Sequence, residues 1–155
     1  MTWLVLAALT LLAGGRVAVP PEVWSAWIAV RDCTPGAHAY RLIAVARGAP
    51  VSVRARTIMV CHATLAPHLP AGPPSGRRAC LVFLLGHELG HQAAHPDDQA
   101  EELQADFAGG ATMRRAGIPR SAIPAYIAPM LSTSSSSHGT SAQRITAVEA
   151  GWLSA

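Results

Sequence analysis

The chain has 155 residues, enough for one domain but too few for a second hydrophobic core. Half of the residues (50%) are hydrophobic and only 14% are charged, which fits a packed core together with a leader or a membrane contact. The formal net charge is +3, but the arginines are scattered from Arg16 to Arg144 without a cluster of interleaved aromatic residues. We therefore expect no nucleic-acid partner.

The first segment, residues 1–15, is apolar apart from two threonines. It is shorter than the ~20 residues that cross a bilayer, and the small residues 13–15 precede Arg16, as in a secretory signal peptide. We predict a signal peptide or a membrane anchor over residues 1–15, with an ordinary buried helix as the alternative, and one domain over residues 16–155. The protein is accordingly expected to be exported to the periplasm or the medium, or to be membrane-anchored, rather than cytoplasmic.

The first half of the domain reads as one helix followed by β-strands. Residues 22–31 place apolar side chains on one helical face, namely Val23, Trp27 and Val30. Two β-like runs follow, 40–46 and 51–61, separated by the hairpin-sized connection 47–50. We expect an edge strand near residues 56–61 that can pair with an extended peptide.

Helices dominate the second half. A proline-rich loop (67–76) precedes a strongly apolar helix over about 77–95, which Pro96 ends. A second helix is expected over about 98–116, with Gly117 as its C′ residue. A weaker helix over 121–131, a serine-rich loop and a final helix over 140–152 complete the chain. The fold class is therefore α+β, mainly α.

The most informative motif is His87-Glu88-Leu89-Gly90-His91. Residues four apart on a helix share a face, so His87 and His91 can bind one metal ion. Glu88 can reach a water on that metal, and Glu102 can be a third ligand from the next helix. Three protein ligands with one open position are typical of a catalytic zinc site rather than a structural one.

The turn at Pro96 is expected to fold the two helices into an antiparallel hairpin. His91 and Glu102 then lie at nearly the same height, since a helix rises about 1.5 Å per residue. Asp106 lies one turn beyond Glu102 and level with His87, where it can accept the other ring N–H of a ligating histidine. A zinc-binding cluster with an orienting carboxylate follows from this spacing.

Such a site predicts hydrolysis. Zinc lowers the pKa of a bound water to about 7, and Glu88 can take the proton from that water and deliver it to the leaving amine. His138, in the serine-rich loop, is the best candidate for a charged donor near the oxyanion. Gly90 is expected to leave room beside the metal. The expectation is a zinc-dependent endopeptidase with one zinc ion per chain, acting on peptides or unfolded protein.

Two other functions fit the same motif. A zinc-binding or regulatory module without activity would need a missing base or a blocked open position, and Glu88 and Gly90 argue against it. A zinc amidase acting on cell-wall peptides would have the same metal site. The cysteines do not indicate a metal site, because none has CxxC spacing; Cys80 is expected to be buried, and Cys33 with Cys61 is the pair to test for a disulfide.

Three segments, His87–His91, Glu102–Ala108 and Ser137–Ile145, together resemble the M48 zinc metallopeptidases of the gluzincin clan, which include HtpX-like membrane proteases and CAAX prenyl proteases. The resemblance covers about residues 77–152. It implies a zincin-like minimal gluzincin fold, with a small β-sheet packed on the HExxH helix and an antiparallel ExxAD helix. It also implies that His87, His91 and Glu102 bind zinc and that Glu88 is the general base. His138 would be the transition-state histidine, and Arg144 a structural arginine. Gly139 stands where the family has proline.

Overall fold

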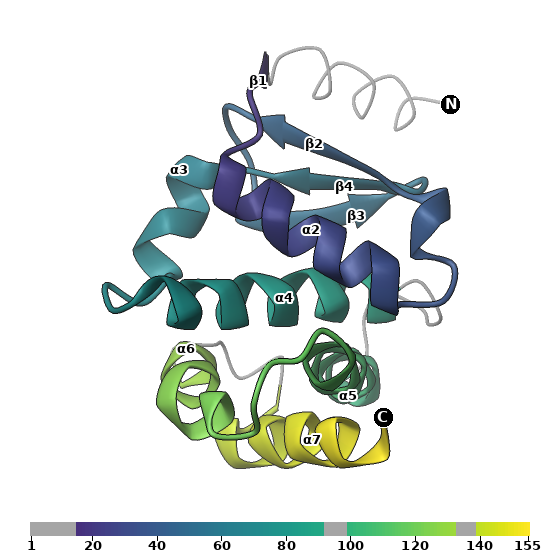
Figure 1. The fold of residues 1–155 in the computed structure, drawn as a ribbon, viewed down its shortest axis with the longest axis vertical. Coiled ribbons are helices and arrows are strands. Elements are labelled where there is room, and N and C mark those ends of the chain that lie inside the picture. Colours follow the sequence, from purple (N-terminus) through teal and green to yellow (C-terminus); the bar gives the residue numbers. More distant parts are fainter. Residues whose placement is uncertain (1–14, 92–98, 133–138) are drawn as a thin grey trace.

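The computed structural model describes residues 15–91, 99–132 and 139–155. A central helix, α4 (Pro74–Gly90), crosses the molecule between two layers (Figure 1). On one side lie a small sheet and helix α2 (Pro21–Cys33). On the other side lie the helices of the second half, which are α5 (Gln99–Arg115), α6 (Ala128–Leu131) and α7 (Ser141–Ser154). The described part is therefore α+β and mainly helical, as expected.

The sheet has four strands in the order β1-β2-β4-β3. The strands are β1 (Arg16–Val17), β2 (Arg41–Val45), β3 (Val51–Arg54) and β4 (Thr57–Val60). The β2–β4 pair is parallel, whereas β1–β2 and β3–β4 are antiparallel. Leu42, Ile58 and Val53 lie in one cross-strand row on the face turned toward the core, so one side of the sheet is buried against the helices.

The predicted hairpin at residues 47–50 is wrong. The chain passes from β2 to β3 there, but β2 pairs with β4 and not with β3. The true hairpin lies inside the predicted second run, where Ala55 and Arg56 form a two-residue connection with positive φ angles of 46° and 58°. Such loops normally carry Asn or Gly, because other residues are strained at positive φ, so this sequence gives no turn signal.

The expectation of an edge strand near residues 56–61 is also wrong. β4 has β2 on one side and β3 on the other, so its backbone is already paired on both sides. The edge that contacts α4 is β3. An extended peptide beside α4 would therefore pair with Val51–Arg54.

Helix α2 confirms the predicted amphipathic pattern. Val23, Trp27 and Val30 are at most 2% exposed and face α4, with which α2 is in contact. The short segment η1 (Ala37–Ala39) connects α2 to β2. The single turn α3 (His62–Leu65) and η2 (Ala66–His68) connect β4 to α4. No helix of the described residues is both long enough and apolar enough to cross a membrane, and residues 1–14 lie outside the described part.

Helix α4 begins three residues earlier than predicted, at Pro74. Proline at the first helical position lacks an N–H that would in any case find no partner in the helix, so the loop prolines start the helix. Its middle is buried all round, with Leu81, Val82 and Phe83 at most 1% exposed. The predicted end of this helix, residues 92–95 with Pro96, lies outside the described residues.

The second half matches its predicted boundaries closely. Helix α5 ends at Arg115, and Gly117 (φ 74°) is its C′ residue as predicted, with Ile118 N–H bonded to Met113 O in a Schellman arrangement. Helix α7 begins with a capping box between Thr140 and Gln143. The proline-containing helix predicted over 121–131 is split into a π-helical turn, η4 (Ile123–Ile127), and α6. The predicted serine-rich loop lies largely outside the described part.

Helices α4 and α5 do not form the predicted antiparallel hairpin. In Figure 1 α4 lies across the view whereas α5 is seen nearly end-on, so the two helices cross steeply. Small residues make the crossing close. A Cβ on Gly90 would lie 2.8 Å from Ala105 Cα, and a Cβ on Gly86 would lie 2.7 Å from Thr112 Cβ. The crossing point, rather than equal distance from a turn, brings the two motifs together.

Candidate metal centre

The last turn of α4 carries two histidines on one face. His87 Nε2 and His91 Nε2 are 3.0 Å apart, and the two rings meet edge to face. His87 is 7% exposed, because it faces α5 rather than solvent. Spacing by four residues therefore gives the shared face that the sequence predicted.

Glu102, in the first turn of α5, completes the cluster. Its Oε2 lies 3.5 Å from His87 Nε2, and its Oε1 lies 3.6 Å from His91 Nε2. One ligand atom from each of the three residues lies within 4.8 Å of the others. Zinc–ligand bonds of about 2.0–2.2 Å in a tetrahedron would separate ligand atoms by about 3.3–3.5 Å, so the observed separations fit one zinc-sized ion.

A buried ion pair orients His87. Asp106 is fully buried, and its Oδ1 lies 2.9 Å from His87 Nδ1. A carboxylate accepts hydrogen bonds, so His87 Nδ1 is the donor and Nε2 keeps its lone pair for the shared centre. Asp106 therefore fixes both the tautomer and the ring orientation of His87.

Arg144, from α7, holds Asp106 in turn. Its Nε donates to Asp106 Oδ2 at 2.7 Å, and its Nη2 donates to Asp106 Oδ1 at 2.8 Å. The same Nη2 is 3.9 Å from Glu102 Oε2. Burial raises the pKa of Asp106, but the hydrogen bonds from Arg144 and His87 outweigh burial, so its pKa lies below the ordinary value. The carboxylate is therefore ionised at neutral pH.

The position of α7 depends on two glycines. A Cβ on Gly151 would collide with the carbonyl oxygen of Phe107, and a Cβ on Gly110 would collide with that of Val148. Without these side chains, the backbones of α5 and α7 approach closely and bring Arg144 onto Asp106. Helix spacing alone did not predict this contact, because 38 residues separate the partners; only the family resemblance pointed to Arg144.

Burial and neighbouring charges shift the pKa values of Glu88 and His91. Burial raises the pKa of Glu88 to about 7; the charge of Glu102 adds to this shift and His87 opposes it. Burial and the charge of His87 lower the pKa of His91, although Glu102 acts in the opposite direction. His91 is therefore neutral at pH 7, as a metal ligand must be. Glu88 is poised near neutrality, as a general base should be.

Gly90 lies where α4 meets α5. The atoms nearest to an added Cβ belong to Ala105 and Ala108 of α5. The missing side chain therefore lets α5 approach α4. Room beside the metal stays a prediction.

The remaining predicted residues divide into two groups. His138 lies outside the described residues, as does His95. Cys33, Cys61 and Cys80 are all free, so the Cys33–Cys61 disulfide does not form; Cys33 faces the carbonyl of Thr112 on α5, whereas Cys61 is buried at the end of β4. Cys80 is buried as predicted, and burial raises its thiol pKa to about 11.

A sizeable hollow of the described surface lies beside the cluster. A cavity of about 550 Å³ is lined by Leu89 and Gly90 of α4, by Phe107 and Ala108 of α5 and by the segment that leads into β2. His87, His91 and Glu102 are not among its lining residues. The triad His87, His91 and Glu102 is therefore a candidate metal centre by its ligand chemistry and not by cavity size.

Comparisons of the chain with models of known protein families, with curated proteins and with solved structures found no match. The description of the site therefore depends on its own residues.

Proposed function

We propose that this protein is a zinc-dependent endopeptidase of the gluzincin type, similar to M48 peptidases. One observation carries the proposal: His87, His91 and Glu102 converge from two helices with ligand atoms within 4.8 Å. Coincidence explains such a cluster poorly, because its two nearest supports, Asp106 and Arg144, are themselves buried. Buried charges are costly unless they are paired, so a buried network of this kind indicates a site that must be held in one geometry.

His87, His91 and Glu102 would hold the metal. Two imidazoles and one carboxylate are the ligand set of several catalytic zinc sites, and they leave a coordination position open. Bound there, zinc would act as a Lewis acid and lower the pKa of a water molecule to about 7. The donor set does not select zinc alone, and manganese or cobalt could substitute for it in vitro.

The protein's own residues supply the proton chemistry. Glu88 follows the first ligand, and its pKa of about 7 suits a group that accepts a proton from the attacking water and returns it to the leaving amine. Asp106 keeps His87 in the tautomer that leaves Nε2 free. Arg144 keeps Asp106 ionised and lies near one oxygen of Glu102. His138 remains the proposed donor to the oxyanion.

The arrangement of the layers supports a peptide substrate. In the proposed zincin-like fold, a sheet edge runs beside the helix that carries the metal ligands, and β3 is the edge that contacts α4. An extended substrate would add to β3 through main-chain hydrogen bonds. Residues 1–15 stay a predicted leader or anchor, which would place the enzyme outside the cytoplasm.

The decisive experiment combines metal content with hydrolysis. Purified chain is analysed by mass spectrometry for bound metal and incubated with casein, together with Glu88→Gln and Glu102→Ala. We expect one zinc per chain in the wild type and in Glu88→Gln, and loss of zinc in Glu102→Ala. Activity should fall by at least about a hundredfold in both variants. Glu149→Gln, which removes a partly exposed acid of α7, is the control and should keep both properties.

Each other outcome has a distinct meaning. A wild type without zinc contradicts the proposed metal centre. Zinc with full activity in Glu88→Gln contradicts the assigned base. Zinc without hydrolysis of casein or of a peptide library, but with release of cell-wall peptides, would favour the amidase. Zinc without any hydrolysis would favour a binding or regulatory module.

A further inference from the structure

We propose that the groove along the free edge of β2 binds an extended, acidic peptide segment by strand addition. This surface is separate from the metal centre, since none of its lining residues belongs to α4, α5 or α7. The proposal is independent of hydrolysis and extends the proposed function by a second peptide-binding surface.

The groove follows an incomplete sheet edge. β1 pairs with Val45 and Ala44, and the chain then leaves the sheet toward α2. Residues 41–43 therefore have β4 on one side and no strand on the other, within the part of the chain that the structure describes. Arg41 N–H bonds to Arg56 O on the β4 side, so within this stretch the backbone N–H and C=O of Leu42 face an incoming chain.

The groove has a defined shape and an aromatic wall. It encloses about 510 Å³ between α2 and the start of β2. Trp24 and Trp27 of α2 form one wall, and Leu42 and Ile43 belong to the strand edge. Trp24 is 45% exposed, which is unusual for so large an apolar side chain and leaves it available for contact.

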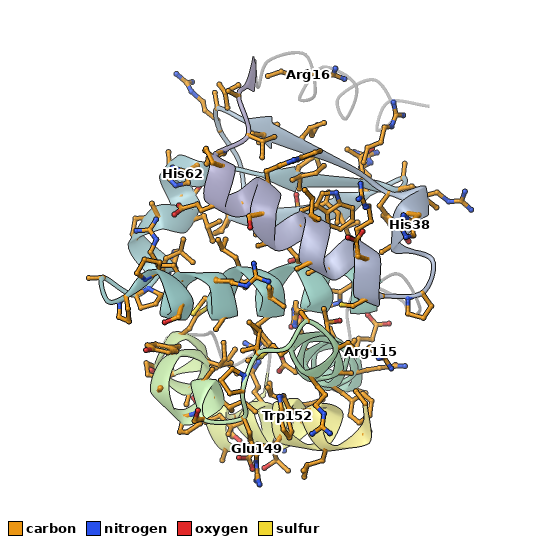
Figure 2. The ribbon with its side chains drawn as sticks, viewed as in Figure 1. Arg16, His38, His62, Arg115, Glu149 and Trp152 are labelled. Atoms are coloured by element: carbon orange, nitrogen blue, oxygen red, sulfur yellow. The ribbon has the colours of Figure 1, made fainter. Side chains whose placement is uncertain are left out.

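The groove is strongly cationic. Arg16, Arg31, Arg41 and His38 line it, and no carboxylate is among its lining residues. Arg31 is paired with Asp32, at 3.1 Å, whereas Arg16 and Arg41 are exposed. Figure 2 shows Arg16 and His38 at separate places on the sheet layer, so the basic side chains are spread along the groove rather than gathered at one point. A strand with several carboxylates complements this distribution better than a single anion does.

Side chains along β2 point alternately to the two faces of the sheet, so an added peptide would be contacted on both faces. Arg41 and Ile43 point to the outer face of the sheet, whereas Leu42 points to the core face. An added strand would likewise alternate, with some side chains near Arg41 and the others near Trp24 and Arg31. A second copy of this chain is a poor occupant, since it would bring Arg16 and Arg41 against the same arginines.

The test is fluorescence polarisation with a labelled octapeptide in which Glu alternates with Val or Thr. The protein is the full chain carrying Glu88→Gln, so that the peptide stays intact. We expect saturable binding that weakens with salt, and much weaker binding of the same peptide with Gln in place of Glu. The double variant Arg16→Gln/Arg41→Gln should weaken binding about three- to tenfold. Arg41→Lys should retain most of it, and Arg47→Gln, at an exposed position of the loop after β2 that does not line the groove, should leave it unchanged.

Backbone pairing is tested separately. Two further peptides carry N-methyl groups on the odd or on the even amides. Only alternate amides of an added strand face its neighbour, so one of the two peptides should lose binding and the other should keep it. Equal binding of both, or of the Gln peptide, would overturn the proposal. So would equal loss in Arg47→Gln, or a dimer in solution that occupies the groove. Far-UV circular dichroism establishes that each variant is folded.

Discussion

The two layers of this molecule use arginine in opposite ways. In the helical layer, Arg144 is 6% exposed and donates two short hydrogen bonds to a fully buried carboxylate. In the sheet layer, Arg16 and Arg41 are exposed along a groove without a lining carboxylate. The difference shows that net charge alone says little about function. A buried arginine builds a site, whereas an exposed arginine makes a surface that can receive a partner.

Replacing one arginine of each kind tests this difference most directly. Arg144→Leu leaves Asp106 buried without its strongest partner, and we expect a loss of about 3–5 kcal/mol in the free energy of unfolding. Arg41→Leu removes an exposed side chain and should change that free energy by less than about 0.5 kcal/mol. Urea denaturation at pH 7 measures both. Equal losses would contradict the difference between the layers.

A pH dependence should come from α4, the helix between the two layers. The pKa of Glu88 is raised in the folded state from 4.5 to about 7. The folded state therefore binds the proton more tightly, and its stability advantage, complete below pH 4.5, is lost as the pH rises through 7. In metal-free protein, wild type should lose on the order of 2–3 kcal/mol relative to Glu88→Gln between pH 4.5 and pH 8. A pH-independent difference between these two proteins would show that Glu88 is not desolvated.

Close helix packing offers a third comparison. Gly151→Ala places a Cβ against the carbonyl of Phe107, and α7 must shift away from α5. We expect a loss of about 1–3 kcal/mol and weaker zinc retention, because Arg144 moves with α7. Gly72→Ala, in a loop where an added Cβ meets nothing within 4 Å, is the control and should be nearly neutral. Thermal unfolding and metal content together separate a packing defect from a site defect.

The smallest effect concerns the sheet layer. Arg56 has a φ of 58°, so Arg56→Gly should relieve strain and stabilise the protein by about 0.5–1 kcal/mol. Ala46→Gly is the matched change at an exposed position that does not have positive φ, and it should destabilise the protein slightly. Stabilisation by both variants would exclude the strain explanation.

Local signals made much of this fold predictable. Apolar spacing located α2, and Gly117 located the C-terminal end of α5, because these features depend on neighbouring residues alone. The hairpin at Ala55 and Arg56 was missed, since its turn lacks the residues that such turns prefer. The parallel pairing of β2 with β4 was missed as a result, because the hairpin was expected between β2 and β3.

The candidate site, too, was only partly predictable from the sequence. The spacing of His87 and His91 defines a shared helical face, and that part needed only the sequence. The steep crossing of α4 and α5 depends on which small residues meet, such as Gly90 with Ala105, and a one-dimensional pattern does not contain that information. The bond from Arg144 to Asp106 likewise depends on the packing of α7.

The hydrogen bonds from His87 and from Arg144 to Asp106 have a consequence for how the protein would handle a metal ion bound at the proposed centre. They fix the first ligand by contacts within the protein, so the ligand geometry does not have to be created by the ion. Little chain entropy is then lost when the ion enters. We expect chelation to leave the helical signal in circular dichroism intact and to be reversed by added zinc within the mixing time, so that the metal behaves as an exchangeable component of a finished scaffold.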